Sequence, residues 1–430
     1  MQEIRRNVRR FFAKLLILGG SILEKVKRLE AQKRLAGLIA NHYSGAREIE
    51  KTKSQLIAWT TTGAPNEILW AMDFYVQFPE AYSATCGARH VAHQHCEVSE
   101  SHGYEHHLCT YCRNSTGATL ADIEGPGSFE PLARPDFLLT TSNSCILITK
   151  WWEHLSRFWN IPMINIDSPV MVPAVDEKEI YGHVKRQCEN LIKYLEKFTG
   201  KKFDYDRLKE ILVNAKSSAD GYKEVMAINK KTPVAATFFD LMGHNFPNLV
   251  LRYKPESGEH YRLMAAEMNQ RVSDGISAMP NMKYRIYWDG IPYWFAIKSM
   301  SEKLQQLDMC LVTSNYFEIF KFDGLDPARP LDSIAETTAK FYLNRSVDYK
   351  AETTERLFRE YNCDAGIFAY ALSCKPFSIS MHYIADEIHK KLDVPVTIVE
   401  GDLVDETFYN EERNNMKLQA LAETLVSKKK

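Results

Sequence analysis

The sequence lacks the features of several protein classes. Its 54 lysines and arginines face 55 aspartates and glutamates, so it has no basic surplus of the kind that nucleic-acid-binding proteins carry. Its nine cysteines are odd in number and irregularly spaced, unlike the cysteines of a disulfide scaffold. We therefore expect a protein of the reducing cytoplasm with no nucleic-acid partner, in which a few thiols bind metal and the others are buried.

Glycine motifs for nucleotide binding are also missing. No G-x-G-x-x-G follows a predicted strand, and no G-x-x-x-x-G-K-[ST] occurs anywhere in the sequence. The α/β units predicted below therefore carry no visible dinucleotide or ATP fingerprint.

No stretch of the sequence is long enough to span a membrane. The most apolar N-terminal run, residues 11–23, is short and is broken by Lys14. Arginines precede it as in a signal peptide, but no small-residue cleavage site follows. We favour an amphipathic helix packed on the body or on a partner, and a helix lying on a membrane surface is the alternative. We do not expect membrane contact.

The order of predicted elements indicates an α/β protein. Short apolar strands alternate with helices in two parts of the chain, which predicts parallel sheets. We expect two Rossmann-like lobes joined by a helical connector, with an N-terminal helical extension. The predicted boundaries are 1–50 for the extension, 51–176 for the first lobe, 177–282 for the connector and 283–430 for the second lobe. Within the lobes we expect a first strand over residues 53–60 and one helix over residues 335–349.

Two cysteines occupy the same local position in the two predicted lobes. Cys145 lies in the turn between a predicted strand, Leu138–Thr141, and a predicted helix, Thr149–Asn160. Cys374 lies likewise after a strand predicted at residues 366–371 and before a helix at 378–391. Open α/β sheets bind ligands at this edge, and a helix N-terminus there favours a thiolate. The repeat predicts a shared site between two units that resemble distant copies.

A third cysteine, Cys109, also lies where a turn meets a helix. It forms a C-x-x-C pair with Cys112, which alone fits zinc, a redox dithiol or no function. No second close pair is present, so we do not expect a four-cysteine zinc ribbon. Single thiols far apart in sequence suit an iron–sulfur cluster between two lobes, and buried structural thiols are the alternative. The other cysteines are expected to be inert core residues: Cys86, Cys96, Cys188, Cys310 and Cys363.

Histidines are concentrated between residues 90 and 107. His-rich tracts bind metal in some proteins. The mixed spacing of these histidines favours a polar helix face, because a metal site needs ligands that converge.

Several short motifs spread along the chain belong together. They include Cys109-x-Tyr-x-Arg113, Asn143-Ser-Cys145, Asn160-Ile-Pro162, Asp289-Gly-Ile-Pro292, Ser373-Cys374-Lys375-Pro376 and Gly401-Asp402. With these motifs the chain resembles a known family, the 2-hydroxyacyl-CoA dehydratase and benzoyl-CoA reductase superfamily. The likeness runs from about Lys53 along most of the chain and is closest to the larger, substrate-binding dehydratase subunit. It implies that Cys109, Cys145 and Cys374 hold a 4Fe-4S cluster between the lobes, with one iron open to water or substrate.

The resemblance also implies residues near the substrate. Pro79-Glu80 matches a turn whose glutamate lies near the substrate in the family, and the turn around Thr61 matches one that reaches the thioester. Cys112 stands where the family varies, so we interpret it as a neighbour of the cluster. The sequence departs from the dehydratases at Ala81 and at Leu372, and residues 402–405 look more like the reductase subunits. These departures leave the exact reaction and substrate open. They do not change the expectation of a cluster.

The implied reaction removes water from an (R)-2-hydroxyacyl-CoA to give a 2-enoyl-CoA. The β proton is too weakly acidic for a protein base, so one added electron would first form a ketyl radical, which expels the hydroxyl and acidifies that proton. The alternatives are a benzoyl-CoA reductase-type subunit that reduces an aromatic acyl-CoA and a non-catalytic electron-carrying iron–sulfur subunit. The implied partners are an acyl-CoA substrate, a homologous second subunit in a heterodimer and an ATP-dependent electron-donating activator.

Overall fold

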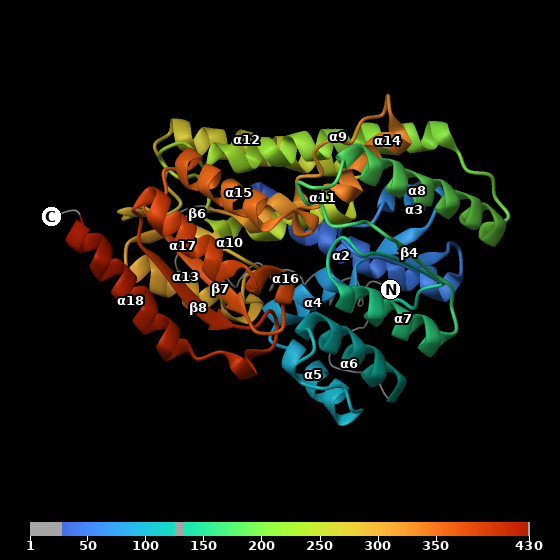
Figure 1. The fold of residues 1–430 in the computed structure, drawn as a ribbon, viewed down its shortest axis with the longest axis horizontal. Coiled ribbons are helices and arrows are strands. Elements are labelled where there is room, and N and C mark those ends of the chain that lie inside the picture. The colour runs from blue at the N-terminus through green and yellow to red at the C-terminus, as the bar shows by residue number, and fades with distance from the viewer. Residues whose placement is uncertain (1–27, 125–131, 429–430) are drawn as a thin grey trace.

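Two four-stranded parallel sheets form the framework of the chain in a computed structural model that describes residues 28–124 and 132–428 (Figure 1). The strands of the first sheet are β1 (Ile57–Trp59), β2 (Tyr75–Gln77), β3 (Phe137–Thr141) and β4 (Met163–Ile166). Those of the second are β5 (Tyr284–Asp289), β6 (Met309–Ser314), β7 (Ala365–Ala371) and β8 (Val396–Gly401). The predicted α/β class with two Rossmann-like lobes is confirmed.

Both sheets have the same strand order. The first runs β2-β1-β3-β4 and the second β6-β5-β7-β8. In each, the strand order reverses between the first and third strands of the unit, and such a switch point opens a crevice at the carboxyl ends of the strands. Cys145 follows β3 and Cys374 follows β7, so the two cysteines occupy equivalent positions in the two lobes.

Helices cover the first sheet and extend below it. In Figure 1, α5 and α6 lie at the lower edge of the molecule, on the connection between β2 and β3. The helices of this half are α2 (Glu30–Thr52), α3 (Asn66–Ala71), α4 (Pro79–Ala88), α5 (Ala92–Ser101), α6 (Thr110–Glu124) and α7 (Ile146–Trp159). The first strand is shorter than predicted, because α2 runs to Thr52 and ends at Lys53, whose φ of 52° is left-handed.

The segment between the sheets is helical, as predicted. Its long helices α9 and α12 run side by side along the upper edge in Figure 1, across both lobes. Arg252 forms a buried ion pair with Glu67 of α3 at 2.7 Å, and Arg285 of β5 donates to the Asn229 carbonyl at 2.6 Å. The connector therefore packs on both lobes, while its boundaries stay a prediction. Its elements are α8 (Glu177–Thr199), α9 (Tyr205–Ile228), α10 (Phe238–Leu241), η1 (Met242–His244), α11 (Asn245–Val250) and α12 (Pro255–Ser273).

The second lobe departs from one prediction. The single helix expected over residues 335–349 is wrong, because α14 ends at Ala339 and α15 begins at Val347. Between them the Asn344 side chain donates to the Pro169 carbonyl at 2.9 Å, and Ser346 caps α15. The helices of this lobe are η2 (Trp294–Ala296), α13 (Ile297–Gln306), η3 (Asn315–Phe320), α14 (Pro330–Ala339), η4 (Tyr342–Asn344), α15 (Val347–Glu360), α16 (Lys375–Ser378), α17 (Met381–Leu392), η5 (Glu406–Phe408) and α18 (Glu411–Lys428).

The N-terminal extension contributes one described helix, α2, which packs on the body. The N–H groups of Glu30 and Ala31 at its start donate to the Glu267 carboxylate of α12 at 2.7 and 2.9 Å. The apolar run at residues 11–23 lies outside the described residues. Within the part of the chain that is described, every helix is too short or too polar to cross a membrane.

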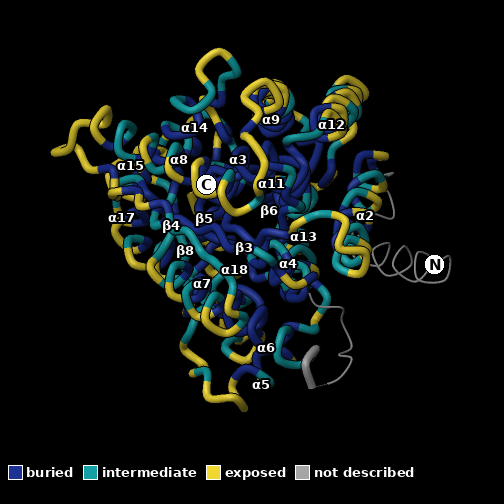
Figure 2. The backbone as a smooth tube through the Cα atoms, turned by 90° about the vertical axis from the view of Figure 1, so that its right-hand side faces the viewer, coloured by how far each residue is buried: buried dark blue, intermediate teal, exposed yellow. Residues whose placement is uncertain are grey.

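Most strands lie in the interior, where Figure 2 shows them dark blue beneath helices with exposed outer faces, whereas the edge strands β4 and β8 are only partly buried. One close contact between the halves of the molecule involves Gly87 of α4. A Cβ atom at this position would lie 2.6 Å from Val404 Cγ1 and 3.0 Å from Trp294 Cβ. Only a glycine lets α4 approach the second lobe this closely.

We predict that Gly87→Ala destabilises the protein although alanine is the better helix former. The clash with Val404 and Trp294 should lower the free energy of unfolding by about 1–3 kcal/mol, as overpacking does elsewhere. The matched control is Gly37→Ala in α2, where nothing lies within 4 Å of the added Cβ, and which should stabilise by about 0.5–1 kcal/mol. Urea unfolding of both variants measures this, and equal midpoints would contradict the packing argument.

A candidate active site between the two sheets

Three cysteines begin helices at the edges of the two sheets. Cys145 is the N-cap of α7, Cys374 is the N-cap of α16, and the Cys109 carbonyl accepts the first helical bond of α6 from Arg113 at 3.0 Å. All three are partly exposed. Backbone N–H groups of the first helical turn face each thiol, because such groups have no partner within the helix. They belong to Cys112 for Cys109, to Ile148 and Leu147 for Cys145, and to Phe377 for Cys374.

The three thiols lie close enough to influence one another's ionisation. Burial raises the pKa of Cys109 well above its usual range, and the Cys374 and Cys145 thiols raise it further. Burial raises the pKa of Cys374 to about 12, and Cys145 adds to this rise. Thiols of this kind stay protonated at neutral pH unless a metal centre takes up their thiolate form. The three cysteines predicted as ligands thus lie in the same region of the structure, together with Cys112.

The spacing of these thiols bears on the kind of metal centre they fit. Among the described residues, no three Cys, His, Asp or Glu side chains lie close enough to hold a single metal ion. A mononuclear site needs its sulfurs within about 4 Å of each other, since a zinc–sulfur bond is about 2.3 Å. A polynuclear cluster instead spreads its thiolates over separate irons. The cysteines of the described residues are therefore not arranged as a mononuclear metal site.

The remaining cysteines are buried in the protein, and two histidines of the histidine-rich stretch contact other side chains. The other six cysteines, Cys112 included, are buried. Burial raises the pKa of Cys112 to about 12, and the nearby Cys145 raises it further. On α5, His95 is buried and its Nδ1 lies 3.0 Å from Asn114 Oδ1, while His93 lies near Glu97 at 3.2 Å. These contacts agree with a polar helix face.

A buried hydrogen-bond network that we did not predict links the cysteine positions of the two lobes. The Thr110 N–H donates to Ser373 Oγ at 3.1 Å, and Ser373 donates to Asp402 Oδ1 at 2.6 Å. The same carboxylate oxygen accepts from the Leu403 N–H at 2.8 Å. Thr110 follows Cys109 and Ser373 precedes Cys374, so the network fixes these two cysteines relative to each other. The motifs around Cys109 and Cys374 were visible in the sequence. Nothing in either motif predicts that Thr110 and Ser373 form a hydrogen bond.

A second tie joins α6 to the second lobe. The fully buried Arg113 side chain forms an ion pair with Asp405 at 2.8 Å and also contacts Glu100 of α5. The Trp294 indole donates to the Tyr111 hydroxyl at 2.7 Å. Because these partners lie beyond β8 and β5, α6 is held against the second lobe although it belongs to the first.

Glu80, at the start of α4, is held by only one of its carboxylate oxygens. Oε2 accepts from the Thr61 hydroxyl at 2.8 Å, the Thr62 N–H at 3.0 Å and the Thr62 hydroxyl at 3.2 Å. Among the described residues, no donor contacts Oε1. Burial raises the pKa of Glu80, and the Thr62 and Thr61 donors oppose this rise. The carboxyl group is thus fixed in place with one oxygen available to a ligand.

Glu80 lines a cavity of about 140 Å³ beside the cysteines. Three residues that lie within three positions of the cysteines in sequence also line it, namely Tyr111, Ser144 and Phe377. Thr62 lines the cavity, whereas Thr61 reaches it only through its bond to Glu80. The far wall is apolar and comes from α11, η3 and η4 and their flanks. Its residues include Phe246, Leu249, Ile319, Phe320, Phe341 and Leu343.

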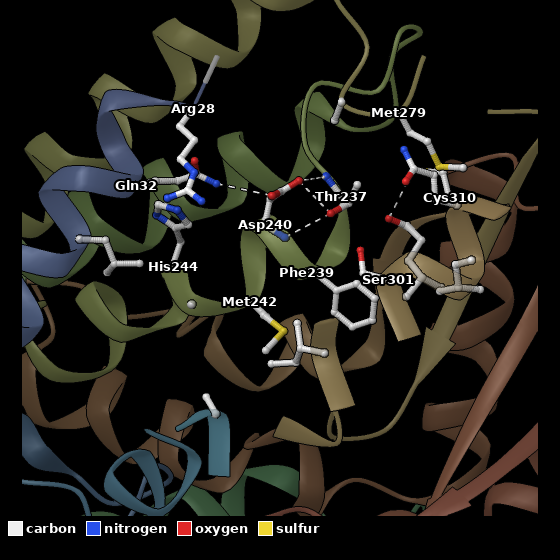
Figure 3. A pocket seen from close by; sticks show the side chains of 18 of the residues that line it. Arg28, Gln32, Thr237, Phe239, Asp240, Met242, His244, Met279, Ser301 and Cys310 are labelled. Carbon is white, nitrogen blue, oxygen red and sulfur yellow. Dashed lines mark hydrogen bonds between the residues drawn. The ribbon is translucent and has the colours of Figure 1, made fainter. Parts of the chain in front are cut away.

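A second cavity of about 160 Å³ adjoins the first (Figure 3). The two share wall residues on α2, α4, η1 and η2, namely Ile39, Ala88, Met242, Gly243 and Trp294. Figure 3 shows polar side chains gathered on one side of the second cavity, among them Arg28, Gln32, Asp240 and His244. His244 Nε2 is buried there without a hydrogen-bond partner. The site therefore has an inner apolar chamber and an outer chamber with a polar wall.

Comparison with known proteins identifies the family. The family model for the 2-hydroxyglutaryl-CoA dehydratase D-component matches residues 61–425. The chain belongs to this family. The resemblance noted in the sequence, to the dehydratase and benzoyl-CoA reductase superfamily and its larger subunit, is thereby confirmed. At the level of the family, the chain is a component of a dehydratase-type enzyme.

Individual relatives of this dehydratase family span nearly the whole chain. The chain is 27% identical over 382 residues to the (R)-phenyllactyl-CoA dehydratase alpha subunit of Clostridium sporogenes, covering 88% of this chain and 92% of the relative. It is 26% identical to the (R)-2-hydroxyisocaproyl-CoA dehydratase alpha subunit of Clostridioides difficile, covering 94% and 98%. It is 25% identical to one of the subunits of the benzoyl-CoA reductase of Thauera aromatica, covering 87% and 89%.

Proposed function

We propose that this chain is the iron–sulfur subunit of a 2-hydroxyacyl-CoA dehydratase and removes water from an (R)-2-hydroxyacyl-CoA to give a 2-enoyl-CoA. One observation carries the proposal: Glu80, anchored through one oxygen and open at the other, lines an apolar cavity next to three gathered thiols. An acid beside a metal centre in a water-poor chamber is what the loss of a hydroxyl group requires. We expect the protein to work in the cytoplasm, as an unpaired set of thiols suggests.

Cys109, Cys145 and Cys374 are the proposed ligands of a 4Fe-4S cluster. When bound, the cluster would supply a low-potential electron and an iron open to the substrate oxygen. The backbone N–H groups that face the thiols would stabilise the negative charge of the thiolates. An ATP-dependent activator is the proposed source of the electron.

Glu80 is the proposed proton donor to the departing hydroxyl. Three donors occupy Oε2, so a proton on this carboxyl group resides on Oε1, and the raised pKa increases the protonated fraction near neutral pH. After one electron has entered the thioester, the α C–O bond breaks and the hydroxide leaves as water with the proton of Glu80. The β carbon then returns a proton to the ionised Glu80, directly or through solvent, and the electron goes back to its donor, so the net change is loss of water.

The outer chamber is the proposed passage for the CoA arm of the substrate. It opens from the inner chamber at Met242 and Trp294, and its polar wall offers Arg28 and the unpartnered His244 nitrogen to polar groups of a ligand. The acyl end would then lie in the inner chamber, where Glu80 is. Thr61 serves as a positioning residue for Glu80 in this arrangement.

Reduction of an aromatic acyl-CoA is the second candidate reaction. The similarity to a benzoyl-CoA reductase subunit favours it, as does the aromatic character of the inner chamber. Analysis of products separates the two, because a dehydratase releases a 2-enoyl-CoA and a reductase yields a dienoyl ring. A purely electron-carrying subunit would have no use for an open carboxyl group in a cavity beside the thiols.

A homologous second subunit is the proposed partner, and an apolar rim beside the cysteines is its proposed docking surface. The rim comprises Ile146, Leu372 and Ile379, which are 72%, 39% and 84% exposed and lie within five residues of Cys145 or Cys374. Isolated exposed apolar side chains are common, but three around one site indicate an interface. The relatives named above as alpha subunits favour a second subunit as the occupant.

We predict that Cys109→Ala, Cys145→Ala and Cys374→Ala each lose most of the bound iron and sulfide, because each removes one of three ligands. Cys112→Ala is the matched control, since it changes a buried thiol in the same C-x-x-C pair. It should retain the cluster. Iron and acid-labile sulfide are measured after anaerobic purification. If only the Cys112 variant lost its iron, Cys112 would be a ligand and the assignment of the other three cysteines would be refuted.

We predict that Glu80→Gln lowers kcat about 10²–10⁴-fold, the usual contribution of a general acid. KM and cluster content should stay unchanged, because glutamine keeps the size and the contacts to Thr61 and Thr62. Thr61→Val removes one of the donors to Oε2 and should lower kcat less, with KM again unchanged. Full turnover by Glu80→Gln with an intact cluster would refute this role.

We predict that Ile146→Asp and Ile379→Asp weaken the association with the second subunit at least about tenfold, a loss of about 1.4 kcal/mol. Val213→Asp is the control, as Val213 is 55% exposed on α9, away from the cysteines. Size-exclusion chromatography of the co-expressed subunits measures this. An intact pair that no longer accepts electrons would instead assign the rim to the activator.

A further inference from the structure

The inner chamber differs from the outer one in the charge of its walls. Glu80 is the only charged side chain among the described residues that line it. Beyond the wall, the Nζ of Lys350 donates to the Leu343 carbonyl at 3.3 Å and lies 5.9 Å from the centre of the Tyr342 ring. Among the described residues, no cation is therefore placed to pair with a carboxylate at the acyl end of a substrate.

The remaining wall of the inner chamber carries no charge, and much of it is apolar and rich in aromatic rings. Phe246, Phe320, Phe341 and Phe377 come from four separate segments of the chain and are buried. Opposite them, α4 presents the small side chains of Ala81, Ala84 and Ala88, which leave the space open. Apolar walls of this kind bind apolar groups by removing their surface from water, and the rings offer edge-to-face contacts to another ring.

The size of the chamber limits the group it accepts. Its volume is about 140 Å³. An engineered protein cavity of about 150 Å³ with a similar lining of Leu, Ile and Phe binds benzene. A side chain of phenyl size fits this space, and an ionised carboxylate there would lose its hydration without gaining a cationic partner.

From these features we infer that the acyl side chain of the substrate is apolar and about the size of a phenyl ring, and that dicarboxylic acyl groups are excluded. The inference rests on the proposed function, because it assumes that the inner chamber holds the acyl end of a CoA thioester. The Asn245 amide on the wall is neutral: its Oδ1 accepts from the Tyr222 hydroxyl at 2.8 Å, and its Nδ2 is buried without a hydrogen-bond partner among the described residues. It does not replace the missing cation.

Binding of two unreactive thioesters tests the inference without turnover. The protein is purified anaerobically with any subunit that accompanies it and titrated with 3-phenylpropionyl-CoA and with glutaryl-CoA in a calorimeter. We expect the phenylpropionyl thioester to bind at least tenfold more tightly. Equal affinities, or tighter binding of glutaryl-CoA, would overturn the inference.

A charge introduced into the chamber provides the second arm of the test. Thr85 lies on α4, lines the chamber and is half-buried, so a longer side chain is accommodated at this position. Thr85→Lys should reduce the preference for the phenylpropionyl thioester at least tenfold by supplying a cation. Thr85→Met, of similar length but uncharged, should preserve it. The same shift in both variants would show that charge does not set the preference. If Thr85→Lys does not fold, the ratio of the wild-type protein's affinities for the two thioesters decides the test.

Turnover separates this inference from the proposed function. The two matching substrates are (R)-phenyllactyl-CoA and (R)-2-hydroxyglutaryl-CoA, assayed with a reducing activator. Dehydration of both with equal kcat/KM would refute the acyl preference and uphold the dehydratase. A clear binding preference with no dehydration of either would uphold the acyl class and refute the proposed reaction.

Discussion

The arrangement of the site depends on one buried carboxylate, Asp402. Its Oδ1 accepts from Ser373 and from the Leu403 N–H, and Ser373 in turn accepts from the N–H of Thr110. Thr110 and Ser373 belong to different lobes, and each is adjacent to a cysteine. A buried acceptor that loses its donors costs about 1–3 kcal/mol, so the lobes gain stability only when these segments are in register. The geometry of the thiols is therefore coupled to the packing of the lobes.

The equivalence of the two sheets explains two of the cysteines but not the third. Cys145 and Cys374 follow the third strand of each unit, at the switch point of the same strand order. Cys109 has no such counterpart, because it lies on the connection between β2 and β3, where α5 and α6 are inserted. Arg113 and Tyr111 hold this insertion against the second lobe through Asp405 and Trp294. A repeated unit thus supplies a symmetric pair of positions, and the insertion makes the site asymmetric.

Local patterns in the sequence were sufficient to predict the strands, most helices and the turns that carry Cys145 and Cys374. The same patterns failed at residues 340–346, because the helix there is interrupted by a bond from Asn344 to Pro169, far away in sequence. They also could not predict the apolar wall of the inner chamber. Phe246, Phe320 and Phe341 lie in short segments with no common periodicity and meet only through tertiary packing. The ligands could be proposed through family resemblance, whereas their surroundings required the fold.

The half-buried position of the cysteines reconciles two opposing demands of the proposed reaction. The proposed radical intermediate must be shielded from water, and the aromatic rings on the wall of the inner chamber would contribute to this shielding. Electrons, however, must arrive from another protein, which requires the thiols to approach the surface, as the exposure of Ile146 and Ile379 beside them indicates. A deeply buried cluster would satisfy the first demand alone. Tyr111, Ser144 and Phe377 on the chamber wall and Ile146 and Ile379 on the surface all lie within five residues of a proposed ligand, so the proposed substrate chamber and the proposed electron-accepting face adjoin the same three thiols.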